Sequence, residues 1–311
     1  MAEKNKFIVA TRGSLLARTQ TGQTVDAIQK QNPESIFEIN QISTMGDNVT
    51  DKPLVSFGGT GVFVKELENA LLDGTADFAV HSLKDVPNNL PDGLFLASFP
   101  LREKTNDLFL AKNGKSIYDL PQNCKIGTGS PRRIVQLRKI RPDAVFSDLR
   151  GNIDTRLRKL EEGQYDAIIL AAAGMLRLGK NLPLSAYIST EEVLPAIGQG
   201  AIAIECRTDD KKTIEAIQKI NHYETEIAVR TERVFMKEIE GGCKFPLAAY
   251  AVVSGNEIKF DVMAGEMATG RYIRKSEIFT IENAAEKAIR MAHDLLDECK
   301  HEGIKLYDLN G

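Results

Sequence analysis

The chain has 311 residues, of which 42% are hydrophobic and 27% are charged. This composition excludes a fibre, a disordered tail and a small disulfide-stapled domain. At roughly 100–200 residues per domain, the length predicts two or three domains. The net charge is −3, from 40 basic and 43 acidic side chains. A generally basic surface for nucleic acid is therefore not expected, and any anion site must be local.

No stretch of the sequence approaches the roughly 20 consecutive apolar residues of a membrane span. Residues 1–6 lead directly into a short apolar strand and not into the core of a signal peptide. We therefore expect a cytoplasmic protein that binds neither membrane nor nucleic acid. The four cysteines, Cys124, Cys206, Cys243 and Cys299, are far apart and form no C-x-x-C pair. They are expected to be free thiols, with no metal site among them.

The N-terminal part of the chain has the pattern β-α-β-α-β. Apolar residues 7–10 predict a buried strand, and Ser14 is the expected N-cap of a helix that runs to about residue 30. A second strand is predicted over residues 36–42 and a third over residues 77–81. Between them lie a glycine-rich loop over residues 46–61 and an amphipathic helix.

The same pattern starts again after residue 107. Strands are predicted over residues 125–127, 144–148 and 166–171, with helices that begin at Ser130 and Ile153. Strands that alternate with helices predict a mainly parallel sheet and a second α/β domain.

The last part of the chain changes pattern again. Residues 188–200 contain the Pro and Gly residues of a linker, and the following strand, residues 201–206, is expected to rejoin the first domain. A helix, several alternating stretches and a final helix then predict antiparallel sheet with helices. The expected domains are residues 1–100 plus 200–220, residues 105–195, and residues 222–311.

Arginines recur where predicted strands end and helices begin. One such arginine alone is a typical surface residue, but ligands of open α/β sheets bind at these strand ends. A helix that starts at Ser130 also directs its first backbone N–H groups toward an anion. Each guanidinium group can bind a carboxylate or a phosphate through two parallel hydrogen bonds. The pattern predicts a polyanionic ligand. The arginines are Arg12, Arg132, Arg133, Arg150, Arg156 and Arg177.

Two further residues can carry chemistry. Asp85, in VHSLKDVP, is either a turn aspartate before Pro87 or a carboxylate that stabilises a developing cation and transfers a proton. Lys84 can pair with Asp85 or with a substrate carboxylate. Cys243, in EGGCKFP, follows two glycines and precedes Lys244, which favours the thiolate. It is either a reactive, modified thiol or a small buried side chain.

Seven segments of the chain resemble those of the porphobilinogen deaminase family, in the same order and over nearly the whole length. They are ATRGSLLARTQ, GVFVKELENALLDGTADFAVHSLKDVP, GTGSPRR, LRGNIDTRL, YDAIILAAAGMLRLG, LPAIGQGAIAIECR and ERVFMKEIEGGCKFPLAAYA. The resemblance implies an α/β fold class, with two α/β domains like those of periplasmic binding proteins and a third, smaller α+β domain with antiparallel sheet.

The resemblance also implies a transferase of tetrapyrrole and haem biosynthesis. Such an enzyme joins four porphobilinogen molecules head to tail on a covalently bound dipyrromethane primer. Each addition releases ammonia, and water then releases linear hydroxymethylbilane. One dipyrromethane per chain is implied, bound by a thioether to Cys243. The family is typically monomeric.

By motif position, Asp85 corresponds to the catalytic carboxylate. The positions implied for cofactor binding, besides Cys243, are Lys84, Ser130, Arg132, Arg133, Arg150 and Arg156. Those implied for substrate binding are Arg12, Ser14, Arg150, Arg156 and Arg177.

The chain departs from the family pattern in places. Ser56 and Thr60 stand where relatives commonly carry lysine in the glycine-rich loop, which the resemblance identifies as a lid. The missing charges put contacts between the lid and substrate carboxylates in question. Gly13, Gly129 and Asp154 also replace more usual residues, and Asp154 can compete for a nearby guanidinium.

Two other functions fit parts of the pattern. A non-catalytic polycarboxylate-binding protein of the same fold would use the same arginines, but the presence of both Asp85 and Cys243 favours the enzyme. A nucleic-acid binder that uses residues 130–133 and 150–158 would lack interleaved aromatic side chains and has the wrong overall charge.

Overall fold

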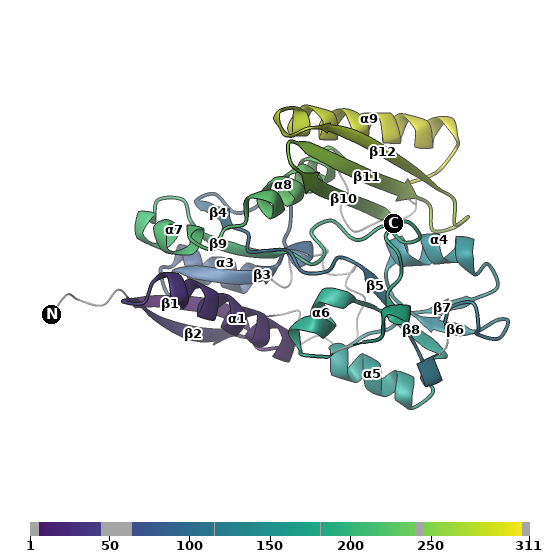
Figure 1. The fold of residues 1–311 in the computed structure, drawn as a ribbon, viewed down its shortest axis with the longest axis horizontal. Helices are drawn as coiled ribbons and strands as arrows, with labels where there is room; N and C mark the ends of the chain where they lie inside the picture. The colour runs from purple at the N-terminus through teal and green to yellow at the C-terminus, as the bar shows by residue number, and fades with distance from the viewer. Residues whose placement is uncertain (1–5, 45–63, 115, 181, 240–244, 307–311) are drawn as a thin grey trace. The chain divides into compact units, whose positions relative to one another are not determined.

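A computed structural model of the chain describes residues 6–44, 64–114, 116–180, 182–239 and 245–306 (Figure 1). The chain forms two compact units: unit 1 contains residues 1–103 and 200–226, and unit 2 contains residues 104–199 and 227–311. The return of the chain to the first unit after the linker is confirmed. The division into three domains stays a prediction. The predicted lid, with Ser56 and Thr60, and Cys243 lie outside the described residues.

Unit 1 is built on a five-stranded sheet of order β2-β1-β3-β9-β4. β1 pairs in parallel with β2 and β3, whereas β9 pairs antiparallel with β3 and β4. The elements are β1 (Lys6–Arg12), α1 (Leu15–Gln31), β2 (Ile36–Ile42), α3 (Lys65–Leu72), β3 (Phe78–Ser82), a 3₁₀ turn (Leu83–Asp85), β4 (Leu94–Ser98), β9 (Ile202–Arg207) and α7 (Lys211–Gln218).

Alternate residues of these strands face opposite sides of the sheet. Phe7 and Phe78 pack with Ile28 of α1, whereas Ala10 and Ala79 pack with Leu67 of α3. Helices therefore cover both faces, as the nearly continuous apolar strands require. The predicted N-cap of α1 is confirmed, because the backbone N–H of Ala17 donates to Oγ of Ser14 at 3.3 Å.

Unit 2 contains a second mixed sheet, of order β5-β8-β6-β7. β6 pairs in parallel with β7 and β8, but β5 runs antiparallel to β8. This sheet is mainly parallel, as predicted, with β5 as its one antiparallel strand among the described residues. The sheet of unit 1 is mixed, because β9 runs antiparallel to both of its neighbours. The elements are β5 (Asp107–Ala111), β6 (Lys125–Gly127), α4 (Pro131–Ile140), β7 (Val145–Ser147), α5 (Ile153–Glu161), β8 (Ala167–Ala171) and α6 (Ala172–Arg177).

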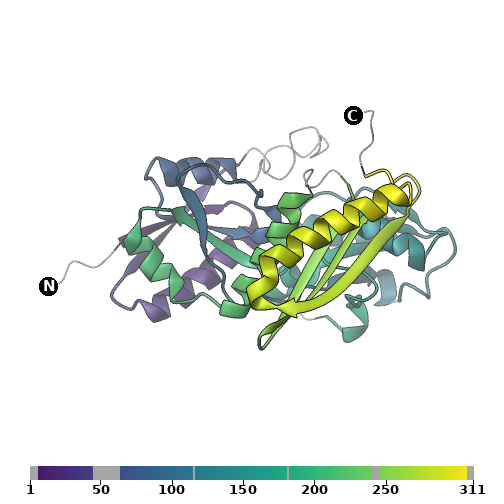
Figure 2. The ribbon, with the colours of Figure 1, turned by 90° about the horizontal axis from the view of Figure 1, so that it is seen from above.

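The rest of unit 2 is the predicted antiparallel sheet with helices. β10 (Leu247–Ser254), β11 (Glu257–Gly265) and β12 (Tyr272–Thr280) form a three-stranded meander, and α9 (Ala284–His301) lies across it (Figure 2). α8 (Tyr223–Glu238) contributes Phe235 to the same core. Among the described helices, none is both long and apolar enough to cross a membrane.

The three described cysteines are buried free thiols, as predicted for them. Burial raises the pKa of Cys206 to about 12 and that of Cys299 to about 11. Cys124 has its pKa raised by the same cause. These thiols are therefore protonated at neutral pH and poor nucleophiles.

Phe260 of β11 lies at the centre of the aromatic core, with ring centroids 5.8 Å from Phe235 and 6.0 Å from Phe279. Because this ring is fully buried, we predict that Phe260→Ala lowers the free energy of unfolding by about 3–5 kcal/mol. Denaturant unfolding followed by circular dichroism measures the change. Ile278→Ala, at an exposed position of β12, should cost less than about 0.5 kcal/mol. Equal losses in the two variants would contradict this packing.

Candidate functional site

Asp85 lies in a small pocket of unit 1. It ends the 3₁₀ turn after β3, and this turn is fixed to the start of β9 by a hydrogen bond from the N–H of Leu83 to the carbonyl of Ala201 at 3.0 Å. The pocket has a volume of about 60 Å³. Its lining residues are Arg12, Ser14, Leu16, Ala17, Gln20, Val64, Val80, His81, Ser82 and Asp85.

Three residues singled out in the sequence thus meet in one place: Arg12, Ser14 and Asp85. Arg12 is the last residue of β1, and Ser14 caps the helix that follows it. β3 is the parallel neighbour of β1, so the carboxyl ends of both strands lie at the same edge of the sheet. Lys84 precedes Asp85 in the same turn but is not among the residues that line the pocket.

His81 is a residue of this pocket that the sequence analysis missed. It lies on β3 with 5% of its surface exposed, and its Nε2 is 2.9 Å from Oε2 of Glu205 on β9. Glu205 is fully buried. A signal was present in the sequence, because a glutamate within the apolar run of residues 201–206 needs a partner when that strand is buried.

Arg132 and Arg133 are buried in unit 2, in the first turn of α4. Nη1 of Arg132 lies 2.8 Å from Oδ2 of Asp107, and Nη2 of Arg133 donates to Oδ1 of the same carboxylate at 2.7 Å. The two guanidinium groups also donate to the carbonyls of Leu194 and Ile169, at 2.6 and 3.1 Å. Both arginines are thus anchored to the protein, and their predicted binding of a ligand stays a prediction.

One carboxylate therefore faces two guanidinium groups, and the cluster of Asp107, Arg132 and Arg133 carries a net charge of +1. Burial by itself raises the pKa of Asp107, but the two arginines outweigh it and hold that pKa far below the usual range. Nε of Arg133 is buried and donates no hydrogen bond to any residue that the structure describes. Excess positive charge and an unused donor fit an acidic ligand.

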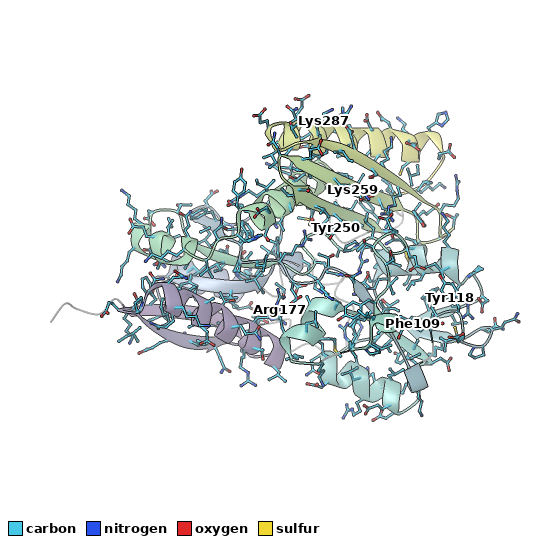
Figure 3. All side chains as sticks on the ribbon, viewed as in Figure 1. Phe109, Tyr118, Arg177, Tyr250, Lys259 and Lys287 are labelled. Atoms are coloured by element: carbon cyan, nitrogen blue, oxygen red, sulfur yellow. The ribbon has the colours of Figure 1, made fainter. Side chains whose placement is uncertain are left out.

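The remaining predicted arginines lie at strand and helix ends of unit 2. Nε of Arg150 is 2.5 Å from Oδ2 of Asp148, and Nε of Arg156 donates to the carbonyl of Gly151 at 2.7 Å. Arg177 is the last residue of α6 (Figure 3).

Two other positions of unit 2 differ in part from expectation. Ser130 occupies the N-cap position of α4, but its side chain makes no capping hydrogen bond. Oδ1 of Asp154 lies 3.7 Å from Nζ of Lys180. Competition of Asp154 for a neighbouring guanidinium stays a prediction.

Two family models match the chain. Residues 7–215 match the porphobilinogen deaminase, dipyromethane cofactor binding domain, and residues 226–297 match the porphobilinogen deaminase, C-terminal domain. The chain is 48% identical over 261 residues to a porphobilinogen deaminase of Brevibacillus brevis, a match that covers 84% of each chain. It is 46% identical over 298 residues to one of Listeria innocua, covering 95% of this chain and 96% of that one.

Solved structures with similar folds have much lower sequence identity. A nutrient binding protein from Burkholderia cenocepacia bound to methionine is 15% identical, with a TM-score of 0.41, over 68% of this chain and 89% of that one. The BvgS VFT2 domain of Bordetella pertussis is 14% identical, with a TM-score of 0.42, over 69% and 86% of the two chains.

The Asp107 cluster predicts a stability that depends on pH. At pH 7, Asp107→Asn leaves two buried guanidinium groups without their carboxylate, so we expect a loss of about 3–5 kcal/mol in the free energy of unfolding. Because the pKa of Asp107 is lowered in the folded state, its stabilising effect is complete above the unfolded value of about 3.9 and declines at lower pH. Urea unfolding between pH 7 and pH 3 measures both effects.

In that experiment the difference between the wild type and Asp107→Asn should narrow below about pH 4. Glu162→Gln, which removes an exposed partner of Arg158, is the matched control and should cost less than about 1 kcal/mol. A constant difference across the pH range would show that the charge of Asp107 is not responsible.

Proposed function

Because the chain belongs to the porphobilinogen deaminase family, we propose that Asp85 is the carboxylate at which its reaction takes place. The enzyme is a hydroxymethylbilane synthase, a transferase that condenses porphobilinogen molecules with loss of ammonia. The proposal rests on the observation that Asp85, Arg12 and Ser14 line the same pocket.

The chemistry assigns distinct roles to these side chains. When ammonia leaves the aminomethyl group of porphobilinogen, positive charge develops on the substrate. A carboxylate at the pocket wall stabilises this charge. It can also accept a hydrogen bond from a pyrrole N–H, or accept the proton that the ring releases. Arg12 can bind the acetate or propionate of the substrate through paired hydrogen bonds. Ser14 can donate to the same carboxylate with its hydroxyl group.

A dipyrromethane group belongs to this family's cofactor-binding domain. When bound, it supplies a pyrrole with a free carbon to which the first porphobilinogen is joined. We assign its covalent attachment to Cys243. Its four carboxylates match the residues available in unit 2, because the Asp107 cluster keeps an excess positive charge and the buried Nε of Arg133 lacks a described partner. The side chains assigned to hold it are Lys84, Ser130, Arg132, Arg133, Arg150 and Arg156.

Arg150, Arg156 and Arg177 are assigned to the carboxylates that each further substrate adds. Arg150 pairs with Asp148, but both side chains are substantially exposed, at 37% and 52%. Such a pair contributes only about 0–1 kcal/mol, so a ligand carboxylate can replace Asp148 at little cost. The buried pairs of Arg132 and Arg133 with Asp107 are much harder to replace, so we expect these arginines to bind the cofactor while they stay paired with Asp107.

We predict that Asp85→Asn retains the fold and loses most of its activity. The amide keeps the shape of the side chain but carries no charge and is no base, so kcat should fall by about 10²–10⁴-fold. Steady-state conversion of porphobilinogen by the cofactor-loaded protein measures this. Asp92→Asn, at an exposed position nearby in the sequence, is the matched control and should keep wild-type turnover. Near-normal turnover by Asp85→Asn would refute the assigned role.

The attachment site is tested by intact-protein mass spectrometry. Wild-type protein should carry an excess mass equal to two linked pyrrole units, and Cys243→Ser should lack it. Cys299→Ser is the matched control, since this thiol is buried in α9 and should not affect the modification. Freshly prepared wild-type protein without the excess mass would instead support a non-catalytic polycarboxylate-binding protein.

A further inference from the structure

Three ionisable side chains from three elements are buried next to the Asp85 pocket. Glu68 of α3 is 7% exposed, His81 of β3 is 5% exposed, and Glu205 of β9 is fully buried. We refer to Glu68, His81 and Glu205 as the buried acid cluster. His81 also lines the pocket that contains Asp85, so the cluster adjoins the proposed site directly.

The sheet brings His81 and Glu205 together. β3 and β9 pair antiparallel with Ala79 opposite Glu205 and His81 opposite Ala203, which places His81 and Glu205 diagonally on the same face. Nε2 of His81 is 2.9 Å from Oε2 of Glu205, an ion-pair distance, and this nitrogen has no hydrogen-bond partner among the described residues. Within the described part of the chain, neither oxygen of Glu205 accepts a hydrogen bond, and Oε1 of Glu68 also accepts none.

This arrangement is costly for a purely structural element. Two buried carboxyl groups lie near one imidazole, which contacts Glu205 alone among them in the described ion pairs. Removing an ion from water costs several kcal/mol unless a partner and hydrogen bonds compensate it. Apolar side chains of similar volume would be as stable or more so at these positions. Groups buried under such conditions beside a pocket are candidates for a functional role.

Such a cluster has its lowest free energy when it holds a proton. Burial, and then the neighbouring Glu205, raise the pKa of Glu68, while His81 and Lys65 oppose this. Of the described charged groups nearby, Arg12 and Asp85 line the pocket beside His81. A proton on this cluster can therefore reside either on a buried carboxyl group or on the imidazole at the pocket wall.

The reaction requires one such proton transfer for each bond formed. The carbon–nitrogen bond of porphobilinogen breaks and ammonia leaves with the electron pair. A carbon–carbon bond then forms to the acceptor pyrrole, whose C–H electrons return to the ring as the proton departs. The aminomethyl nitrogen leaves as ammonia only once it is protonated, so the balance closes when the proton released by one condensation protonates the aminomethyl group of the next porphobilinogen. The proton must be held somewhere between the two events.

We propose that the buried acid cluster, with His81 at the pocket wall, takes up the proton released by each condensation and gives it to the aminomethyl nitrogen of the next porphobilinogen, which then leaves as ammonia. The inference rests on the proposed function of the Asp85 pocket. His81 is the group through which the proton enters, and Glu205 stabilises the imidazolium that results. Glu68 holds the proton farther from the pocket.

Glu68→Gln tests the inference most sharply. An amide has the shape of a protonated carboxyl group, so the variant should fold with the thermal stability of the wild type. The amide is neither an acid nor a base near neutral pH, so it cannot donate or take up the proton. Its KM for porphobilinogen should stay within about twofold, while kcat falls at least tenfold, about 1.4 kcal/mol in activation free energy. Glu68→Asp, which keeps a carboxyl group, should recover part of kcat. Glu38→Gln, at an exposed position of β2, is the matched control.

A second measurement does not depend on turnover. In infrared spectra at neutral pH, the wild type should show the carbonyl stretch of a protonated carboxyl group, which shifts in D₂O and is absent in Glu68→Gln. Wild-type kcat in Glu68→Gln, an equal spectrum in both proteins, or a large loss of thermal stability in the variant would each overturn the inference. If Asp85→Asn loses turnover and Glu68→Gln does not, only this inference fails and the proposed function stands.

Discussion

The antiparallel pairing of β3 with β9 is the interaction on which the proposed site depends. β9 follows an excursion of the chain through unit 2 and returns to the centre of the five-stranded sheet, between β3 and β4. The pairing continues past Ser82 to the hydrogen bond between Leu83 and Ala201, and so fixes the turn that carries Asp85. It also places Glu205 beside His81. A weakened β3–β9 contact would disturb both groups together.

Buried charged groups are compensated differently in unit 1 and in unit 2. In unit 2, Asp107 faces two guanidinium groups and accepts hydrogen bonds from Arg133 and Gln199, which makes a rigid anchor at the start of α4. In unit 1, His81 lies 2.9 Å from Glu205, and both oxygens of Glu205 and Oε1 of Glu68 accept no hydrogen bond from a described residue. The first arrangement fixes side chains in place, whereas the second leaves buried carboxyl oxygens without hydrogen bonds, which is why we propose that it holds a proton.

Much of this organisation follows from the sequence. The meeting of Arg12 with Asp85 was predictable, because neighbouring parallel strands end at the same edge of a sheet. The burial of Arg132 and Arg133 was not, since their partner Asp107 begins β5, and no local pattern indicates that this strand end lies beside the first turn of α4. Contacts between residues far apart in the chain, such as His81 with Glu205, depend on strand pairing, which periodicity does not specify.

The central claim is that chain growth takes place at Asp85. The direct test is intact mass spectrometry of the cofactor-loaded protein a short time after it is mixed with porphobilinogen. The wild type should show a ladder of species that have gained one, two or more pyrrole units, and Asp85→Asn should show almost none at the same time. A ladder that forms in Asp85→Asn at the wild-type rate would place the chemistry elsewhere and contradict the account.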